Sequence, residues 1–136
     1  MIVYTSSPGD LSPSQLEGFF VGWPKPPSRE AHLKMLHQAS HVVLAVDDEI
    51  GRVVGFVNAI SDGVLAAYLP LLEVLPEYQG RGIGKELMRK ILQEIGDLYI
   101  IDLVCDDGLV AYYEGFGFKP GRTMMIRNYE RQAGSV

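Results

Sequence analysis

A single cysteine, Cys105, occurs in the 136-residue sequence, so the chain cannot form an intrachain disulfide. The sequence also lacks a Cys-x-x-Cys pair, and its three histidines do not cluster, so no metal-ligand spacing is present. We therefore predict a protein that holds no metal ion.

Long apolar runs and an excess of basic residues are missing as well. No apolar run reaches the ~18 residues that a membrane helix needs, and residues 1–7 lack the basic start of a signal peptide. Seventeen acidic residues outnumber twelve basic ones, and the net charge of −5 opposes nucleic-acid binding. We expect a cytoplasmic protein with no membrane or nucleic-acid partner, acting on a cationic or neutral substrate.

Length and composition fit one folded domain. With 136 residues, 47% of them apolar, the chain can build one ordinary core but not two. We predict a single domain over residues 1–136, in which residues 130–136 form a flexible tail.

Residues 72–85 have the pattern of a strand, a turn and the start of a helix. The apolar run breaks at Pro76, and glycines follow at positions 80, 82 and 84. Apolar residues then recur at helical spacing with charged residues on the other face, which predicts an amphipathic helix. Its apolar positions are Ile83, Leu87, Met88, Ile91, Leu92 and Ile95. The first turn of a helix has free N–H groups and a partial positive charge, so a turn without side chains predicts a pyrophosphate site.

The spacing of the glycines decides among the known phosphate motifs. A P-loop needs a glycine where this chain has Gln79 and a Ser or Thr where it has Glu86. The dinucleotide fingerprint needs its third glycine at the position of Lys85. Both motifs are therefore excluded, while a tight strand-to-helix connection without a ligand stays open.

The motif that fits is Gln/Arg-x-x-Gly-x-Gly/Ala, formed by Gln79, Gly82 and Gly84 and preceded by Val74 and Pro76. Here the chain resembles the GNAT N-acetyltransferase superfamily, which holds the pyrophosphate of acyl-CoA in this way. The resemblance implies acetyl-CoA as co-substrate. The residues implied to bind it are Leu72, Glu73, Val74, Gln79, Gly80, Arg81, Gly82, Ile83, Gly84, Lys85 and Tyr113.

The remaining elements agree with that family's fold. We expect strands in residues 1–6, 42–46, 53–58, 64–75, 98–104 and 118–125, the strand at 98–104 being buried. We expect helices that begin at Pro13 behind a Ser12 cap, in residues 28–38 behind a Ser28 cap, and in residues 108–114 behind Asp106 and Asp107. His32 and His37 should be solvated helix residues. The expected fold is α/β, the GNAT acyl-CoA N-acyltransferase fold, with a mixed, mostly antiparallel sheet of six or seven strands flanked by about four helices.

Residues 111–118 supply a second motif, which looks like the Phe-Tyr-Glu-x-x-Gly-Phe segment of the same superfamily. The resemblance places Tyr113 on the tyrosine that faces the sulfur of CoA. Acyl transfer from a thioester expels a thiolate, and a phenol with a pKa near 10 can protonate it while neutral at pH 7. Tyr113 is therefore our general acid, with a core tyrosine as the alternative; Tyr112 is the expected core residue.

The acyl donor should lie where the family sheet splays, between the strands at 72–75 and 98–104. The backbone of Leu72, Glu73 and Val74 would contact the pantetheine, and the Val74 N–H would polarise the thioester carbonyl. Related sequences often carry an acid three residues before this valine, where this chain has Leu71. Glu73 is our first candidate for the base that deprotonates the amine, and Asp102 the second; either could instead be a structural ion-pair partner.

Trp23, the only tryptophan, lies in a proline-rich loop. It forms either a wall of the acceptor pocket or a plug over the core edge. The Gly-Trp-Pro segment resembles that of arylalkylamine acetyltransferases, so the favoured acceptor is a small, arylalkyl-type primary amine, acetylated by direct attack in a ternary complex. The alternatives are a protein N-terminus or lysine as acceptor, and a non-catalytic acyl-CoA-binding protein. A homodimer is also considered.

Overall fold

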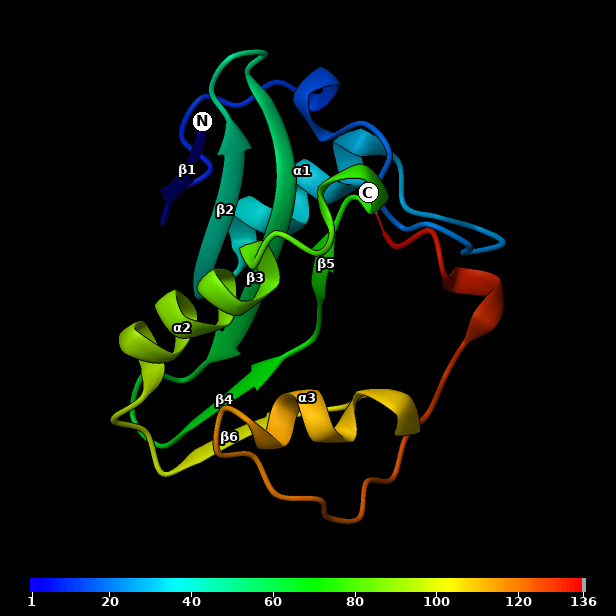
Figure 1. Ribbon diagram of the computed structural model, residues 1–136. Coiled ribbons are helices and arrows are strands. Elements are labelled where there is room, and N and C mark those ends of the chain that lie inside the picture. The colour runs from blue at the N-terminus through cyan, green and yellow to red at the C-terminus, as the bar shows by residue number, and fades with distance from the viewer. Residues whose placement is uncertain (136) are drawn as a thin grey trace.

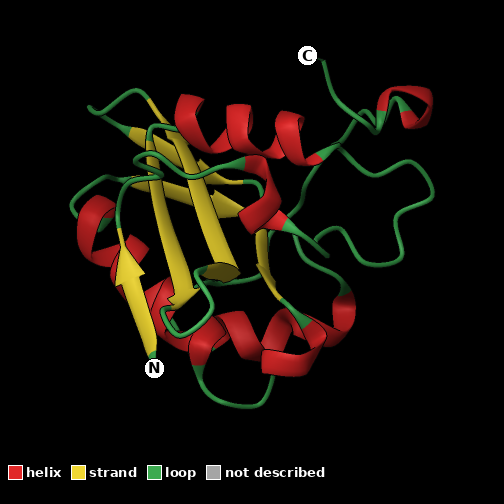
Figure 2. Cartoon of the chain, turned by 90° about the horizontal axis from the view of Figure 1, so that it is seen from above, coloured by secondary structure: helices red, strands yellow, loops and turns green. Residues whose placement is uncertain are grey.

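The computed structural model describes residues 1–135; Val136, the last residue of the predicted tail, lies outside the described residues. Within that range the fold is a six-stranded sheet with helices on both faces (Figure 1, Figure 2). The strands are β1 (Ile2–Thr5), β2 (His41–Asp47), β3 (Arg52–Ser61), β4 (Ala66–Leu69), β5 (Leu72–Val74) and β6 (Ile100–Leu103). The helices are α1 (Arg29–Gln38), α2 (Ile83–Ile95) and α3 (Val110–Glu114), and 3₁₀ turns cover Pro13–Leu16, Pro76–Tyr78, Asp107–Leu109 and Tyr129–Arg131. The predicted mixed α/β fold is confirmed, with three α-helices in place of about four.

The sheet has the order β1-β2-β3-β4-β6, and β5 pairs with β3 beside β4. The long strand β3 makes this possible because its middle part pairs with β5 and its last residues pair with β4. All these pairs are antiparallel except β4–β6, which is parallel. The single strand predicted at residues 64–75 is therefore two strands, β4 and β5, separated by residues 70–71.

Two apolar clusters cover the two faces of the sheet. On one face α2 packs its predicted apolar stripe against the inward side chains of the central strands, for example Val43, Ala45 and Val57. On the other face α1 and the Pro13–Leu16 turn pack against Leu44 and Phe56. Neighbouring strand residues enter opposite clusters because side chains alternate along a strand. Each fully buried Leu or Ile contributes about 1.5–3 kcal/mol, so α2 is held mainly by this packing.

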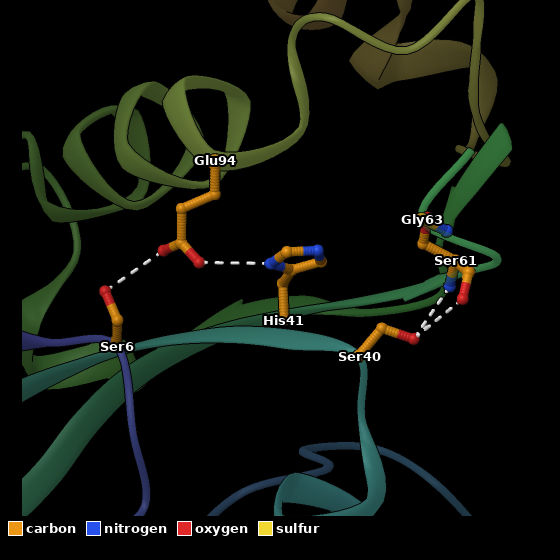
Figure 3. A network of polar contacts seen from close by, with 6 residues as sticks. All are labelled: Ser6, Ser40, His41, Ser61, Gly63 and Glu94. Carbon is orange, nitrogen blue, oxygen red and sulfur yellow. Dashed lines mark hydrogen bonds and ion pairs between the residues drawn. The ribbon is translucent and has the colours of Figure 1, made fainter. Parts of the chain in front are cut away.

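A carboxylate near the end of α2 joins the helix to the sheet (Figure 3). Glu94 accepts a hydrogen bond of 3.0 Å from the Ser6 hydroxyl, and its other oxygen lies 3.2 Å from His41 Nδ1. Beside it, Ser40, just before β2, is joined to Ser61 at the end of β3, since the Ser61 N–H donates to the Ser40 hydroxyl at 2.8 Å. These contacts fix the end of α2 that lies away from the glycine turn.

The first forty residues differ in part from the prediction. Pro13–Leu16 is a single 3₁₀ turn and not a longer helix, because Gly18 and Phe20 take left-handed φ values of 93° and 63°. The second predicted helix is confirmed as α1, and Ser28 caps it by accepting the Ala31 N–H at 3.0 Å. None of the helices within residues 1–135 is long and apolar enough to cross a membrane.

The prediction for His32 was wrong, since it is 1% exposed. Its ring packs against Phe19, Phe20 and Phe56 at centroid distances of 4.5–5.3 Å. Neither ring nitrogen has a hydrogen-bond partner within residues 1–135. Burial disfavours the charged form and lowers the pKa of His32 to about 4. His37, which follows on the same helix, is exposed as predicted.

The C-terminal third is more open than the sequence indicates. Strand β6 is only half-buried and its Asp102 is exposed, because β6 pairs along one edge, with β4, and lies at the margin of the sheet. The predicted cap of the following helix is also wrong, since the Asp106 side chain makes no cap hydrogen bond. Residues 118–125 form no strand, in contrast to the prediction. The Tyr129–Arg131 turn overlaps the start of the tail predicted at residues 130–136, and the Gln132 side chain accepts the Lys25 N–H at 2.8 Å.

Candidate active site

The break between β4 and β5 opens the sheet. At this break the side chain of Asn58, which is 3% exposed, replaces a backbone partner: its Oδ1 accepts the Leu71 N–H at 3.1 Å. The Asn58 N–H donates in turn to the Leu71 carbonyl at 3.3 Å. As a result β5 pairs with β3, whereas β4 pairs with β6 up to the Leu69–Leu103 pair. Beyond that pair β5 and β6 have no register, and a gap separates them.

The backbone of β5 offers hydrogen-bonding groups to this gap. The Leu75 N–H donates to the Val54 carbonyl at 2.9 Å and the Leu71 carbonyl accepts from Asn58, so residues 71, 73 and 75 direct their polar groups to β3. Polar groups alternate between the two edges of an antiparallel strand. Leu72 and Val74 therefore direct theirs away from β3, as the predicted contacts with an extended ligand require. The Val74 carbonyl accepts from Gln79 Nε2 at 3.0 Å, which leaves the Val74 N–H for a ligand.

The glycine turn presents bare backbone at the start of α2. Gly80 and Gly82 have φ values of 78° and 80°, and a Cβ on either would meet no atom within 4 Å. The N–H groups of residues 80–85 have no partner within the described chain, and the first helical bond is from the Glu86 N–H to the Gly82 carbonyl at 3.1 Å. Open space, free donors and a helix N-terminus together fit a pyrophosphate.

The side chains around the turn brace it. Arg81 lies over the Tyr78 ring, with its guanidinium carbon 4.9 Å from the centroid, and it donates to the Glu77 carbonyl at 3.2 Å. The Tyr78 hydroxyl donates to Asp47 at 2.7 Å, and this bond lowers the pKa of Asp47. Of the other predicted binding residues, Ile83 is buried and can offer only its backbone, whereas the Lys85 side chain is exposed.

Helix α3 closes the site from the other side. A Cβ on Gly84 would lie 3.1 Å from the Tyr112 hydroxyl and 3.7 Å from Val74, so α3, β5 and the glycine turn meet at this point. Tyr112 is 36% exposed and is not the core residue that the sequence predicts. Its neighbour Tyr113 is the more buried of the two and packs on the α2 cluster. Burial, with smaller contributions from Tyr112 and Cys105, raises the pKa of Tyr113 to about 12.

Tyr113 lines a cavity of about 330 Å³ at the gap between β5 and β6. The walls are mainly aromatic and aliphatic, and include Trp23, Tyr68, Leu71, Leu72 and Met88. Trp23 is held there by Phe20, whose ring centroid is 4.9 Å away. The charged residues of the wall are Asp106 and Arg127. Within residues 1–135 no group of three or more His, Cys, Asp or Glu side chains could hold a metal ion.

Comparison with known proteins identifies the family. The sequence model of the acetyltransferase (GNAT) family matches residues 10–118, most of the chain. The chain belongs to the GNAT acetyltransferase family. A crystal structure of a putative acetyltransferase from Deinococcus radiodurans is 47% identical, with a TM-score of 0.96, and the match covers 99% of this chain and 94% of that one.

Two plant proteins show how the family varies. A histone acetyltransferase of Glycine max is 32% identical over 84% of this chain and 54% of its own length. A chloroplastic serotonin N-acetyltransferase of Oryza sativa is 30% identical over 72% of this chain and 50% of its own length. This GNAT protein therefore spans about half the length of these curated relatives.

The predicted bases of this acetyltransferase lie in different surroundings. Glu73 does not line the cavity that contains Tyr113; its two oxygens accept the Phe20 N–H at 2.9 and 3.0 Å, and one of them also accepts the Val21 N–H at 3.4 Å. Asp102 lines a second cavity, of about 990 Å³, which Tyr113 also borders. The structure thus brings Tyr113 and Trp23 together in one cavity, with Glu73 behind the loop that carries Trp23.

Sequence reasoning missed two charged residues of the cavity that contains Tyr113 and Trp23. Asp106 follows the end of β6, the position where side chains often point into a site at the C-terminal edge of a parallel strand, and this signal could have found it. Arg127 lies between the strand predicted at 118–125 and the tail predicted at 130–136, and nothing in its sequence surroundings indicates the cavity.

Proposed function

We propose that this GNAT protein transfers the acetyl group of acetyl-CoA to a small primary amine by direct attack in a ternary complex. The observation that carries the proposal is the meeting of three features at one gap in the sheet. These are the free N–H groups of residues 80–85, the unpaired edge of β5 and the buried hydroxyl-bearing ring of Tyr113. If the glycine turn were only a tight strand-to-helix connection without a ligand, these three features would not need to lie together.

Each feature has one task in the reaction. The N–H groups of the glycine turn bind the pyrophosphate, and Leu72 and Val74 pair with the pantetheine. When bound, acetyl-CoA supplies an acetyl group activated as a thioester. The Val74 N–H polarises its carbonyl while the amine nitrogen bonds to the carbonyl carbon and the carbon–sulfur bond breaks. Tyr113 then gives its proton to the sulfur.

The proton of the attacking ammonium must go to a carboxylate, directly or through water. Glu73 and Asp102 remain the predicted bases. Because both oxygens of Glu73 already accept backbone N–H groups, we propose that it mainly positions the Phe20–Val21 backbone, and hence Trp23. Asp106 is the carboxylate in the wall of the cavity that contains both Tyr113 and Trp23, so it joins Asp102, in the second cavity, as a candidate base.

The walls of the cavity support a small acceptor with an apolar or aromatic part. An amine with an aryl ring would place the ring against Trp23 and its nitrogen toward Asp106. The rice relative is named for serotonin, which is such an amine. The alternative acceptor is a lysine side chain or the N-terminus of a protein. The soybean relative supports this alternative, because it is named as a histone acetyltransferase.

A screen for thiol release from acetyl-CoA tests the proposal. Amines with and without aryl rings, amino acids and lysine-containing peptides would each be added to the full chain with saturating acetyl-CoA. We expect the highest kcat/KM with a small arylalkylamine. Higher values with peptides would favour the protein acceptor, and binding of acetyl-CoA without release of thiol by any acceptor would show a non-catalytic protein.

A further inference from the structure

The cavity that contains Tyr113 and Trp23 carries one acidic and one basic side chain in its wall. The acid is Asp106, which follows β6, and the base is Arg127, which lies in the C-terminal segment, residues 119–135. Both side chains are exposed, and no ion pair joins them in the part of the chain that the structure describes. A ligand in this cavity therefore meets two opposite charges at separate points.

Arg127 has no carboxylate partner within the described chain. Its guanidinium donates to the Ile126 carbonyl and to the Met125 sulfur, each at 3.3 Å. By contrast, three arginines in the body of the fold each pair with a glutamate, namely Arg29, Arg52 and Arg89. A guanidinium has five N–H donors in a planar fork that matches the two oxygens of a carboxylate. The cavity thus presents an uncompensated cation to whatever it binds.

The C-terminal segment is held beside the loop that carries Trp23. The Gln132 side chain accepts the Lys25 N–H at 2.8 Å, and Lys25 lies two residues after Trp23. Between Arg127 and Gln132 the chain folds into the Tyr129–Arg131 turn. Figure 1 shows this segment, in red, close to the tip of the N-terminal loop, in blue. These contacts place Arg127 and Trp23 on one cavity.

The phosphates of acetyl-CoA do not account for this cation. None of the described residues that line the cavity belongs to the glycine turn at 80–85, which carries the proposed pyrophosphate site. The part of acetyl-CoA that would reach the cavity is the pantetheine with its thioester, and this part is uncharged. An anionic partner for Arg127 must then come from the acceptor.

The size and charges of the cavity restrict that acceptor further. A volume of about 330 Å³ is at the lower end of the range for small-molecule sites, roughly 300–1,000 Å³. An amine without an anionic group would be attracted by Asp106 but repelled by Arg127, whereas a molecule with an ammonium and a carboxylate satisfies both. The aromatic side chains of Trp23 and Tyr68 favour a ring as its third part.

We infer that the acceptor is an aromatic amino acid, an arylalkylamine that also carries a carboxylate, and that Arg127 selects it by binding this carboxylate. The inference rests on the proposed function, because it names the acceptor class of the same site. The amino group lies toward Asp106 and the ring against Trp23, while the fork of Arg127 holds the carboxylate. Arg127 therefore determines specificity and transfers no proton.

The reaction with such an acceptor is balanced. The ammonium gives one proton to the base, and its nitrogen bonds to the thioester carbonyl carbon while the carbon–sulfur bond breaks. The nitrogen loses a second proton as the amide forms, and Tyr113 protonates the leaving thiolate. The products are the N-acetyl amino acid, CoA with a free thiol and one proton released to water.

The test compares two acceptors with the full chain and saturating acetyl-CoA. Phenylalanine and phenylethylamine share the ring and the primary amine, and only phenylalanine carries a carboxylate. The inference predicts a kcat/KM for phenylalanine at least about tenfold above that for phenylethylamine, because a charge-assisted bidentate pair forms with phenylalanine alone. Calorimetric titration of both compounds into the chain with CoA should show the same preference without turnover.

Three variants locate the preference. Arg127→Gln should lower kcat/KM for phenylalanine about tenfold or more, mainly through KM, and should not lower the value for phenylethylamine. Arg127→Lys keeps the charge without the fork, so it should recover part of the loss. Arg122→Gln removes a cation of the same segment that does not line this cavity, and it should change neither value.

The outcomes separate this inference from the function on which it rests. A kcat/KM for phenylethylamine equal to or above that for phenylalanine would overturn the inference alone. A preference for phenylalanine that Arg127→Gln leaves intact would overturn it as well. Thiol release with no amine at all would instead contradict the proposed function, and the calorimetric titration of native chain and Arg127→Gln would still decide whether Arg127 binds the carboxylate.

Discussion

Both carboxylate oxygens of Glu73 accept the backbone N–H of Phe20, at 2.9 and 3.0 Å. Phe20 is the one non-glycine residue with a positive φ, 63°, within residues 1–135. A left-handed conformation costs a bulky residue about 1–2 kcal/mol, and a charge-assisted hydrogen bond can offset that cost. Glu73 on β5 therefore fixes the turn from which Trp23 reaches the cavity.

This contact makes different predictions for two Glu73 variants. Glu73→Gln keeps an oxygen that accepts the Phe20 N–H, so kcat and the acceptor KM should both change by less than about threefold. Glu73→Ala leaves two backbone N–H groups without an acceptor, so the acceptor KM should rise about tenfold as the loop loses its position. Steady-state kinetics of both variants measure these effects.

The same measurements test Glu73 as the base. Loss of a base should lower kcat/KM by about 10²-fold in Glu73→Gln at neutral pH, with partial recovery at high pH where the free amine is abundant. That result would assign proton transfer to Glu73 and contradict the positioning role. Asp106→Asn and Asp102→Asn would then be expected to retain most of the activity.

His32 should make the fold sensitive to acid. Its pKa is about 4 in the folded chain, against 6.5 as the ordinary value, so the folded state keeps the ring neutral while the unfolded state binds a proton. The free energy of unfolding therefore keeps its full value above about pH 6.5 and decreases as the pH drops toward 4, by about 3 kcal/mol at most. Thermal unfolding across this range should show the loss.

Two histidine variants isolate this effect. His32→Phe fills the same aromatic cluster without a titrating group, so its unfolding midpoint should depend less on pH than that of the native chain. His37→Gln changes the exposed histidine of α1 and should leave the dependence unchanged. If the unfolding midpoints of all three proteins depend equally on pH between about pH 4 and 6.5, His32 is not the group that causes the acid sensitivity.

Acetyl-CoA should stabilise the fold through the glycine turn. Free ligand at about 100 times its dissociation constant adds about 2.7 kcal/mol, which raises the unfolding midpoint. Gly84→Val should abolish this rise because its side chain would stand against Tyr112 and Val74 where the turn faces α3. Gly82→Val is a poorer test than the sequence indicates, since φ at Gly82 is 80° and a β-branched residue would strain the fold itself.

The outcome depends on comparing each protein with and without ligand. Gly84→Val should remain folded, with only the hydroxyl end of Tyr112 displaced, so its midpoint without ligand is the internal control. An unchanged midpoint of the native chain at millimolar acetyl-CoA would contradict binding at the turn. A Gly84→Val protein that responds like the native chain would place the ligand elsewhere.

Local patterns predicted the elements that carry the proposed acetyl-CoA site. The apolar period after residue 82 and the glycines at 80 and 82 determine a helix that begins on bare backbone, and the structure has α2 there. The strands at 42–46 and 53–58 were predicted in the same way from two apolar runs that flank a polar turn, and they pair as β2 and β3. These features depend on neighbours in the sequence, so a single sequence is enough to find them.

The errors fall where distant segments meet. The Glu73–Phe20 contact joins residues 53 positions apart, and the break at residues 70–71 depends on Asn58 of another strand. His32 reads as a polar helix residue, but three phenylalanines from other elements enclose it. The run Thr123–Ile126 has strand composition, but a strand forms only where an edge is available, and within residues 1–135 it pairs with none.

The most direct test of the proposed mechanism is kcat of Tyr113→Phe on the best amine from the screen, beside Tyr112→Phe as the matched control. Phenylalanine keeps the ring packing on Phe118 and removes only the hydroxyl. With a pKa of about 12, Tyr113 keeps its proton over the whole assay range. We predict that Tyr113→Phe lowers kcat about 10²-fold or more with an unchanged KM for acetyl-CoA, while Tyr112→Phe stays within about threefold of the native chain. A Tyr113→Phe protein with native kcat between about pH 7 and 9 would contradict the account.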